Sequence, residues 1–171
     1  MLILNSTEVR KSLPMAETIA AMKSAYLALS TGKAEMPLRA RLPVPPQEAV
    51  SLFMPAFVNN EEDHALAVKI VSVFPKNPEK GLPLIHASVV VMDAETGKTL
   101  ALLEGGALTA IRTGAGAGAA TDILARKDSK VIAIFGAGVQ ARTQLEAACT
   151  VRNIEKVWVY DPIEENANNF A

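Results

Sequence analysis

The segment around residue 136 constrains the fold of this chain most. In it, a short apolar run is followed by a turn that contains glycine and then by a helical pattern. Val131–Phe135 is rich in β-branched side chains and predicts a strand, after which Gly136 and Gly138 form a Gly-x-Gly turn. A helical pattern then runs to Cys149, with Ala141 at the position of a third glycine. Gly136 permits the tight turn, Gly138 lets the backbone approach a ligand, and Ala141 is small enough for close packing of the helix.

The next segment completes the first βαβ unit of a dinucleotide-binding fold. Lys156–Tyr160 predicts a second strand, which ends at Asp161. The start of the intervening helix offers unpaired N–H groups and a positive dipole end to phosphates. An acid at the end of the second strand accepts hydrogen bonds from the adenosine ribose and repels a 2′-phosphate, so Asp161 favours NAD over NADP. The alternative is that Asp161 only forms a turn before Pro162.

Composition and charge argue against several classes of partner. Half of the 171 residues are apolar and the formal net charge is −1, which favours neither a nucleic-acid partner nor an anionic membrane surface nor a disordered chain. No apolar window is long enough to cross a membrane, and the apolar start at residues 1–4 is too short for a signal peptide. We therefore expect a soluble cytoplasmic protein.

Cysteine and histidine give little sign of a reactive or metal-binding site. Cys149 is the only cysteine, and we expect it to be a small buried helix residue rather than a catalytic thiol. His64 and His86 lack neighbours at metal-ligand spacing, so no metal site is expected.

The first 125 residues have a different pattern, typical of an α+β domain. A helix is expected from Pro14 to about Ser30, and another over residues 107–125. The stretch 114–120 of that second helix is made of Gly and Ala, and no clean strand precedes it. It therefore predicts close packing against a neighbour rather than a second nucleotide loop. Between the two helices, strand-like runs occupy residues 39–44, 50–54, 66–74, 88–92 and 99–103.

We therefore predict an α/β protein in two parts. Residues 1–125 form an α+β domain, and residues 126–171 form the first βαβ portion of a truncated Rossmann domain. Parallel sheets need both faces covered, so either the natural protein contains more chain or this product is a fragment that another surface supports.

Two cations lie in unusual sequence environments. Lys69 lies within the apolar run 66–74, so it must reach solvent, pair or face a polar cavity. Arg112 is the only charge in a long stretch of mostly Ala, Gly and Thr, where a guanidinium suits a bidentate anion such as a carboxylate. An edge strand for Lys69 and a structural Arg–Asp pair for Arg112 are the alternatives. With Arg39 or Arg41, these residues suggest a substrate that bears a carboxylate.

Several short motifs give the chain a resemblance to the ornithine cyclodeaminase/μ-crystallin family over nearly its whole length. The most specific are Leu-Thr-Ala-Ile-Arg-Thr at 108–113 and Gly-Ala-Gly-Val-Gln-Ala at 136–141. The other matching segments are residues 36–39, 54–56, 68–70, 81–83 and 93–97.

The resemblance implies an N-terminal domain that binds substrate and forms a homodimer, followed by a Rossmann domain that binds NAD. It also implies that Arg39, Lys69 and Arg112 clamp the substrate carboxylate, with Arg41 as the alternative to Arg39. Lys69 is the catalytic residue that it implies, as a proton-transfer group. The cofactor-binding residues that it implies are Thr113, Gly136, Gly138, Val139, Gln140 and Asp161.

The implied activity is NAD-dependent redox chemistry on a small amino or imino acid. It would be of the ornithine cyclodeaminase, alanine dehydrogenase or pyrroline-2-carboxylate reductase type. Phe53 stands where the cyclodeaminases proper carry a glutamate before Met-Pro, which argues mildly against a strict ornithine enzyme. The family's later catalytic aspartate is expected beyond residue 171. Two alternatives are a non-catalytic binding protein like μ-crystallin and an inactive truncated fragment that still dimerises.

Overall fold

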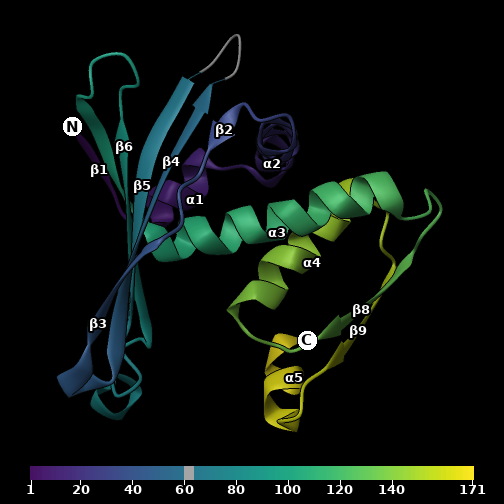
Figure 1. Cartoon of the computed structure of the whole chain (residues 1–171). Helices are drawn as coiled ribbons and strands as arrows, with labels where there is room; N and C mark the ends of the chain where they lie inside the picture. The colour runs from purple at the N-terminus through teal and green to yellow at the C-terminus, as the bar shows by residue number, and fades with distance from the viewer. Residues whose placement is uncertain (60–63) are drawn as a thin grey trace. The chain divides into compact units, whose positions relative to one another are not determined.

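The computed structural model describes residues 1–59 and 64–171, which form two compact units. Unit 1 comprises Met1–Ser12 and Ala25–Leu108, and unit 2 comprises Leu13–Ser24 and Thr109–Ala171. Two long helices, α2 (Met15–Ser30) and α3 (Gly105–Leu124), contribute residues to both units (Figure 1). The functional division at residues 125 and 126 stays a prediction.

Unit 1 is built on a mixed sheet that has seven strands within the described residues. The strand order is β1-β7-β6-β5-β4-β2, and β3 also pairs with β4 (Figure 1). Strand β1 runs parallel to β7, whereas the other pairs are antiparallel. The strands are β1 (Leu2–Leu4), β2 (Ala34–Glu35), β3 (Ala40–Val44), β4 (Ala49–Asn59), β5 (His64–Val73), β6 (Ile85–Met92) and β7 (Thr99–Glu104). The mixed α/β class that the sequence predicts is confirmed.

Strand β4 is longer than the run 50–54 that the sequence predicts, because it continues through Pro55. Its outer edge pairs with β3 up to Phe53 and with β2 from Phe57 onward. Pro55 falls in the gap between these two pairings, where its missing N–H interrupts neither of them. The proline is therefore compatible with a strand that pairs with β5 along its length.

Helix α3 begins directly after β7, at Gly105, two residues earlier than the sequence predicts. The Glu104 carboxylate accepts the N–H groups of Gly106 and Ala107, both at 2.7 Å, and so caps the helix. A Cβ atom on Gly105 would lie 2.6 Å from the Ala87 backbone carbon, so only glycine fits this approach to β6. The remaining helices of unit 1 are α1 (Ser6–Ser12) and the 3₁₀ turns η1 (Pro45–Gln47) and η2 (Pro78–Lys80).

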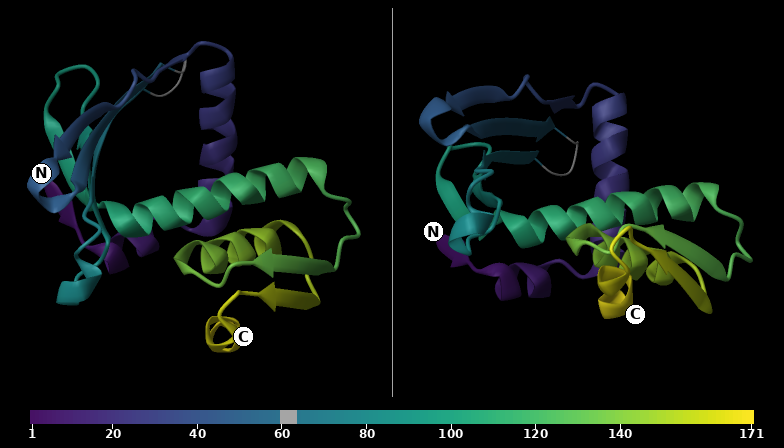
Figure 2. Two further views of the ribbon diagram at one scale, coloured as in Figure 1. Left: turned by 60° about the horizontal axis from the view of Figure 1, so that its bottom comes forward. Right: turned by 90° about the horizontal axis from the view of Figure 1, so that it is seen from below.

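Unit 2 contains a parallel pair of strands, β8 (Val131–Phe135) and β9 (Lys156–Tyr160), as the sequence predicts. Helix α4 (Val139–Val151) connects them and lies between these strands and α3 (Figure 2). The short helix α5 (Glu164–Phe170) follows β9. One face of the strand pair packs against α4 and α5 through Ile134, Ala141 and Phe170. The other face exposes aromatic rings, and Phe135 is 81% exposed.

Helices α3 and α4 pack at the small residues of α3. A Cβ atom on Gly114 would lie 2.4 Å from the Thr143 carbonyl oxygen of α4, so the two backbones nearly touch. One turn later, a Cβ atom on Gly118 would lie 2.9 Å from the Ala147 Cβ and 2.8 Å from the end of Ile19. The prediction of close packing by this Gly/Ala stretch is confirmed.

The expectation that Cys149 is buried is wrong. Its thiol is free and exposed on α4. The buried positions of this turn are taken by Ala147 and Ala148, which face the packed interior. The helical pattern of small residues gave Cys149 the wrong face, because a shift of one residue rotates a side chain by about 100°.

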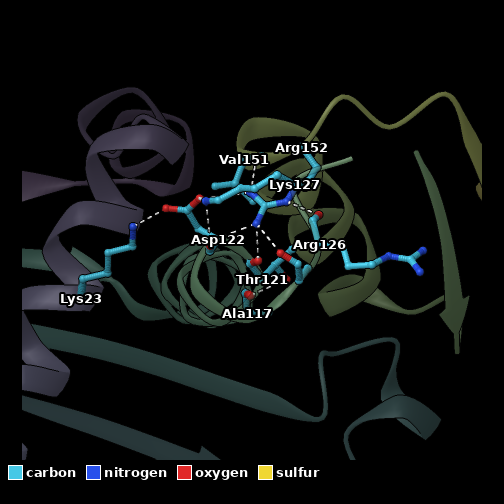
Figure 3. A network of polar contacts seen from close by, with 9 residues as sticks. Lys23, Ala117, Thr121, Asp122, Arg126, Lys127, Val151 and Arg152 are labelled. Atoms are coloured by element: carbon cyan, nitrogen blue, oxygen red, sulfur yellow. Dashed lines mark hydrogen bonds and ion pairs between the residues drawn. The ribbon is translucent and has the colours of Figure 1, made fainter. Parts of the chain in front are cut away.

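A buried arginine closes the C-terminal end of α3 (Figure 3). The Arg152 side chain is 3% exposed and donates to the Asp122 carboxylate at 3.1 Å. It also donates to backbone carbonyls of Thr121, Asp122, Ala125, Arg126 and Val151. Asp122 in turn accepts a hydrogen bond from Lys23 of α2 at 2.5 Å. The guanidinium thus satisfies the carbonyl groups that a helix end leaves without partners.

None of the helices in the described part of the chain combines the length and apolar character that crossing a bilayer requires.

We expect Gly114→Ala to lower the free energy of unfolding by about 1–3 kcal/mol, because a backbone carbonyl has to move to admit the methyl group. Gly118→Ala is the matched control. The same methyl group there would lie 2.8 Å from the movable end of Ile19 and 2.9 Å from the Ala147 Cβ, both longer than the 2.4 Å approach to the Thr143 carbonyl oxygen at Gly114, so its cost is smaller. Urea unfolding of both variants checks this order, and a Gly114→Ala protein as stable as the wild type would contradict the packing.

We expect Asp122→Asn to remove an acid-sensitive part of the stability. Hydrogen bonds from Lys23, and then from Arg152, lower the pKa of Asp122 from 3.8 to about 2. A lowered carboxyl pKa stabilises the fold above the unfolded value, and this stabilisation is lost as the pH falls from about 4 to about 2. Urea midpoints measured across this range should fall less steeply in Asp122→Asn than in the wild type. Asp128→Asn, at a carboxylate that is 87% exposed, is the control and should keep the wild-type slope.

Candidate dinucleotide-binding site

The turn between β8 and α4 has the backbone shape that a Gly-x-Gly motif predicts. Gly136 has a φ of +92°, a conformation that glycine adopts without steric cost. A Cβ atom on Gly138 would meet no heavy atom of the described residues within 4 Å, so the space beside this residue is open. Ala141 is buried with Ile134 and Phe170, which confirms it as the small residue of this helix–strand contact.

The N-terminus of α4 suits an anion. Gly138 is the N-cap residue, so the cap position has no side chain to bond the first turn. The first N–H groups of a helix have no partner within it, and the dipole is positive there. Val139 is exposed in this first turn, whereas the side-chain oxygen of Gln140 is buried with no hydrogen-bond partner in the described residues. The open glycine and the uncapped helix fit the phosphates of a dinucleotide at this end, whereas the Gln140 oxygen is an acceptor that would need a donor such as a hydroxyl group.

Asp161 lies at the end of β9 and accepts hydrogen bonds from two backbone groups. Its Oδ2 accepts the Ala137 N–H at 2.8 Å, and its Oδ1 accepts the Ile163 N–H at 2.9 Å. These bonds, first from Ala137 and then from Ile163, lower the pKa of Asp161 below its ordinary value. The bond to Ile163 is the turn-forming role that the sequence allows. The ribose-binding role stays a prediction.

Thr113 is carried by α3 and is half-buried. It precedes Gly114, which approaches the Thr143 carbonyl of α4. Because Gly114 lies beside Thr143 and Gly118 beside Ala147, the two helices run in the same direction. The level of Thr113 on α3 therefore corresponds to the first turns of α4, and a role for Thr113 toward the cofactor stays a prediction.

In unit 1, Lys69 lies on an inner strand of the sheet. Strand β5 has β4 on one side and β6 on the other, and Lys69 pairs with Met54 and Val89. The edge-strand alternative for Lys69 is therefore wrong. Side chains alternate between faces, so half-buried Lys69 shares a face with Met54, Val89 and the buried Val71.

The two candidate arginines of unit 1 lie at the start of β3. Arg41 pairs with Leu52 of β4, and Arg39 immediately precedes Ala40, the first residue of β3. Both arginines are exposed. Leu52 lies on the sheet face that carries Lys69, so Arg41 shares this face. If the β3–β4 register continued by one residue, Arg39 would stand opposite Met54, in line with Lys69.

Arg112 is exposed on α3 in unit 2. The Arg–Asp ion pair at the end of α3 joins Asp122 to Arg152, with Lys23 as a further partner, and does not involve Arg112. The role of Arg152 is not predictable from the sequence, because an arginine just after a helix gives no signal of what it caps. Within residues 1–59 and 64–171, no cluster of three or more His, Cys, Asp or Glu side chains is arranged to hold a metal ion.

A parallel β-α-β unit with a glycine turn, an open helix N-terminus and an acid at the end of the second strand is the arrangement of dinucleotide-binding proteins. A model of the ornithine cyclodeaminase/mu-crystallin family matches residues 1–171. The chain belongs to this family, and the resemblance seen in its motifs is confirmed.

Relatives and solved structures agree with this assignment. A Delta(1)-pyrroline-2-carboxylate reductase of Bacillus cereus is 42% identical over 100% of this chain and 52% of its own length. The structure of the Thermococcus litoralis Delta(1)-pyrroline-2-carboxylate reductase in complex with NADH and L-proline is 50% identical, with a TM-score of 0.89 over 100% of this chain and 52% of that one. An archaeal alanine dehydrogenase dimer with bound NAD is 36% identical, with a TM-score of 0.89 over 99% of this chain and 51% of that one.

The chain spans about half the length of the curated relatives that it matches. The cofactor class that the sequence predicts agrees with these structures, two of which hold NADH or NAD.

We expect Gly136→Ala to destabilise the protein although the space beside it is open. At a φ of +92° an L side chain is strained, at a cost of about 1–2 kcal/mol. Gly138→Ala is the comparison variant, since its φ of −78° suits any residue and its only expected cost is the poorer N-cap preference of alanine, so its loss of unfolding free energy should be smaller than that of Gly136→Ala. Thermal unfolding without cofactor checks both values, and equal stability of the two variants would contradict the strained turn.

Proposed function

We propose that the protein functions in the NAD-dependent reduction of a cyclic imino acid, Δ1-pyrroline-2-carboxylate, to L-proline. The observation that carries this proposal is the 50% identity, over the whole of this chain, to the Thermococcus litoralis reductase solved with NADH and L-proline. The homodimer and the cytoplasmic location expected from the sequence are part of the same proposal.

The cofactor half of this proposal concerns the turn between β8 and α4. We infer that Val139 and Gln140 bind the pyrophosphate through backbone N–H groups, with Gly138 allowing its close approach and Gly136 shaping the turn of the cofactor site. We also infer that Thr113 contacts the cofactor and that Asp161 binds the adenosine ribose. The uncapped start of α4 and the ionised carboxylate at the end of β9 support these roles. NADH, when bound, supplies the hydride.

The substrate half concerns the cations Arg39, Lys69 and Arg112, which we propose bind the substrate carboxylate. Fixing the carboxylate orients the C=N bond, and the positive charges neutralise an anion next to the carbon that accepts the hydride. As the hydride adds to this carbon, the π electron pair of the C=N bond moves to the nitrogen, which takes a proton. Lys69 is our candidate for handling that proton. Its place on an inner strand, on the same face as Arg41, supports a role beyond reaching solvent.

The sheet register weakens the inference that Phe53, in place of a glutamate, speaks against a strict ornithine enzyme. Phe53 pairs with Ile70 rather than with Lys69, so its side chain lies on the opposite face of the sheet from Lys69. The identity of residue 53 therefore does not bear directly on the groups beside Lys69. Alanine dehydrogenase and cyclodeaminase chemistry need the same carboxylate clamp, and a screen of amino and imino acids separates them from the reductase.

We expect Arg112→Ala to lower kcat/KM for Δ1-pyrroline-2-carboxylate by about 10- to 100-fold, because a charged hydrogen-bonding partner of the carboxylate is lost. The affinity for NADH should stay within about twofold of the wild type. Oxidation of NADH gives the rate, and fluorescence titration gives the affinity. Arg126→Ala, at a side chain that is 86% exposed, is the control and should behave as the wild type.

Other results would point to other functions. Equal losses of turnover and NADH affinity in Arg112→Ala would contradict its assigned role. A wild-type protein that binds NADH without turning over any imino or amino acid would favour a binding protein. A wild-type protein that does not bind NADH would favour an inactive fragment.

A further inference from the structure

The glycine turn is held to the end of β9 by two consecutive hydrogen bonds. The Gly136 N–H donates to the Tyr160 carbonyl oxygen at 2.7 Å. The next N–H along the chain, that of Ala137, donates to Asp161 Oδ2 at 2.8 Å. The first bond continues the parallel pairing of β8 and β9, whereas the second depends on one side chain.

The other oxygen of the same carboxylate holds the segment that follows β9. Asp161 Oδ1 accepts the Ile163 N–H at 2.9 Å and the Asn166 side-chain amide at 3.3 Å. The carboxylate therefore joins the glycine turn to the start of α5. Bonds from N–H groups to a carboxylate are stronger than bonds between neutral groups, so this junction restrains the turn from within the protein itself.

We propose that Asp161 is a positioning residue that holds the Gly136–Gly138 turn in its phosphate-binding shape, in addition to any contact with the ribose. This inference rests on the proposed function, because it concerns the same dinucleotide site. It assigns the N–H groups of Gly136 and Ala137 to anchoring the turn. The phosphates are then left to the uncapped first turn of α4, which begins at Val139.

The inference differs in a measurable way from a role in ribose selection alone. A carboxylate that only selects the ribose repels a 2′-phosphate, so its removal should improve binding of NADP. A carboxylate that also holds the turn supports the binding of either dinucleotide, so its removal should weaken NAD binding and offset the gain in NADP binding.

The first measurement is amide hydrogen exchange by NMR on the wild type, Asp161→Ala and Asp161→Asn, all without nucleotide. We expect the Ala137 amide to exchange at least about tenfold faster in Asp161→Ala, because it loses a bond to a charged acceptor. In Asp161→Asn, which keeps an acceptor oxygen, the change should be smaller. Asn166→Ala removes only the 3.3 Å contact and should leave Ala137 as in the wild type. Protected amides of β8 show that each variant is folded.

The second measurement is the affinity of the same proteins for NAD and for NADP. We expect Asp161→Ala to weaken NAD binding, and Asn166→Ala to weaken the binding of neither dinucleotide by more than about twofold. Unchanged exchange at Ala137 in Asp161→Ala overturns the inference, and so does unchanged NAD binding by that variant. If the wild type binds neither dinucleotide while the Ala137 result holds, the proposed function fails and the anchoring of the turn stands.

Discussion

The close approach of α3 and α4 is the contact on which unit 2 depends. At Gly114 the two backbones nearly meet, and any side chain there would push the Thr143 carbonyl away. Helix α4 is held by this contact on one side and by Ile134 and Phe170, through Ala141, on the other. Small residues on both sides of α4 therefore fix the helix between α3 and the two strands, and its N-terminus, at the glycine turn, is fixed with it.

The polar cluster around Arg152 completes the same arrangement at the opposite end of α4. A helix end leaves carbonyl groups without partners, and burial makes this costly. One guanidinium meets several of these carbonyls together with the Asp122 carboxylate, and Lys23 ties α2 to the same acid. A lysine has no planar set of five donors with which to do this. The C-terminal ends of α3 and α4 are thus joined by hydrogen bonds, whereas nearer their N-termini, at Gly114 and Gly118, the two helices are joined by close packing.

Local patterns in the sequence predicted the β8–α4–β9 unit, the close packing of the Gly/Ala helix and the small residue Ala141, because each depends on residue type and spacing along one segment. The features that escaped prediction depend on partners far away in the chain. The bond from Ala137 to Asp161 and the capping of α3 by Arg152 join residues 24 to 31 positions apart. Glu104 could have been recognised, since an acid placed before two glycines at a helix start has a local capping role. Cys149 was misplaced because a pattern of small residues does not fix the rotation of a helix.

The register of the strands decides which cations of unit 1 lie on the same face of the sheet. The periodicity of the sequence does not give this register. The apolar run around Lys69 predicted a strand, but only the pairing with Met54 and Val89 shows that this strand is internal and which face carries the lysine. The same register places Arg41 on that face and Phe53 on the other. Phe53, directly before Met54, therefore lies on the wrong face of the sheet to act with Lys69. Arg41 is two strands away from Lys69 but lies on the same face, so these two residues can act together. A comparison of Arg39→Ala with Arg41→Ala in the substrate titration consequently asks whether the arginine inside the paired strand or the one just before it completes the clamp.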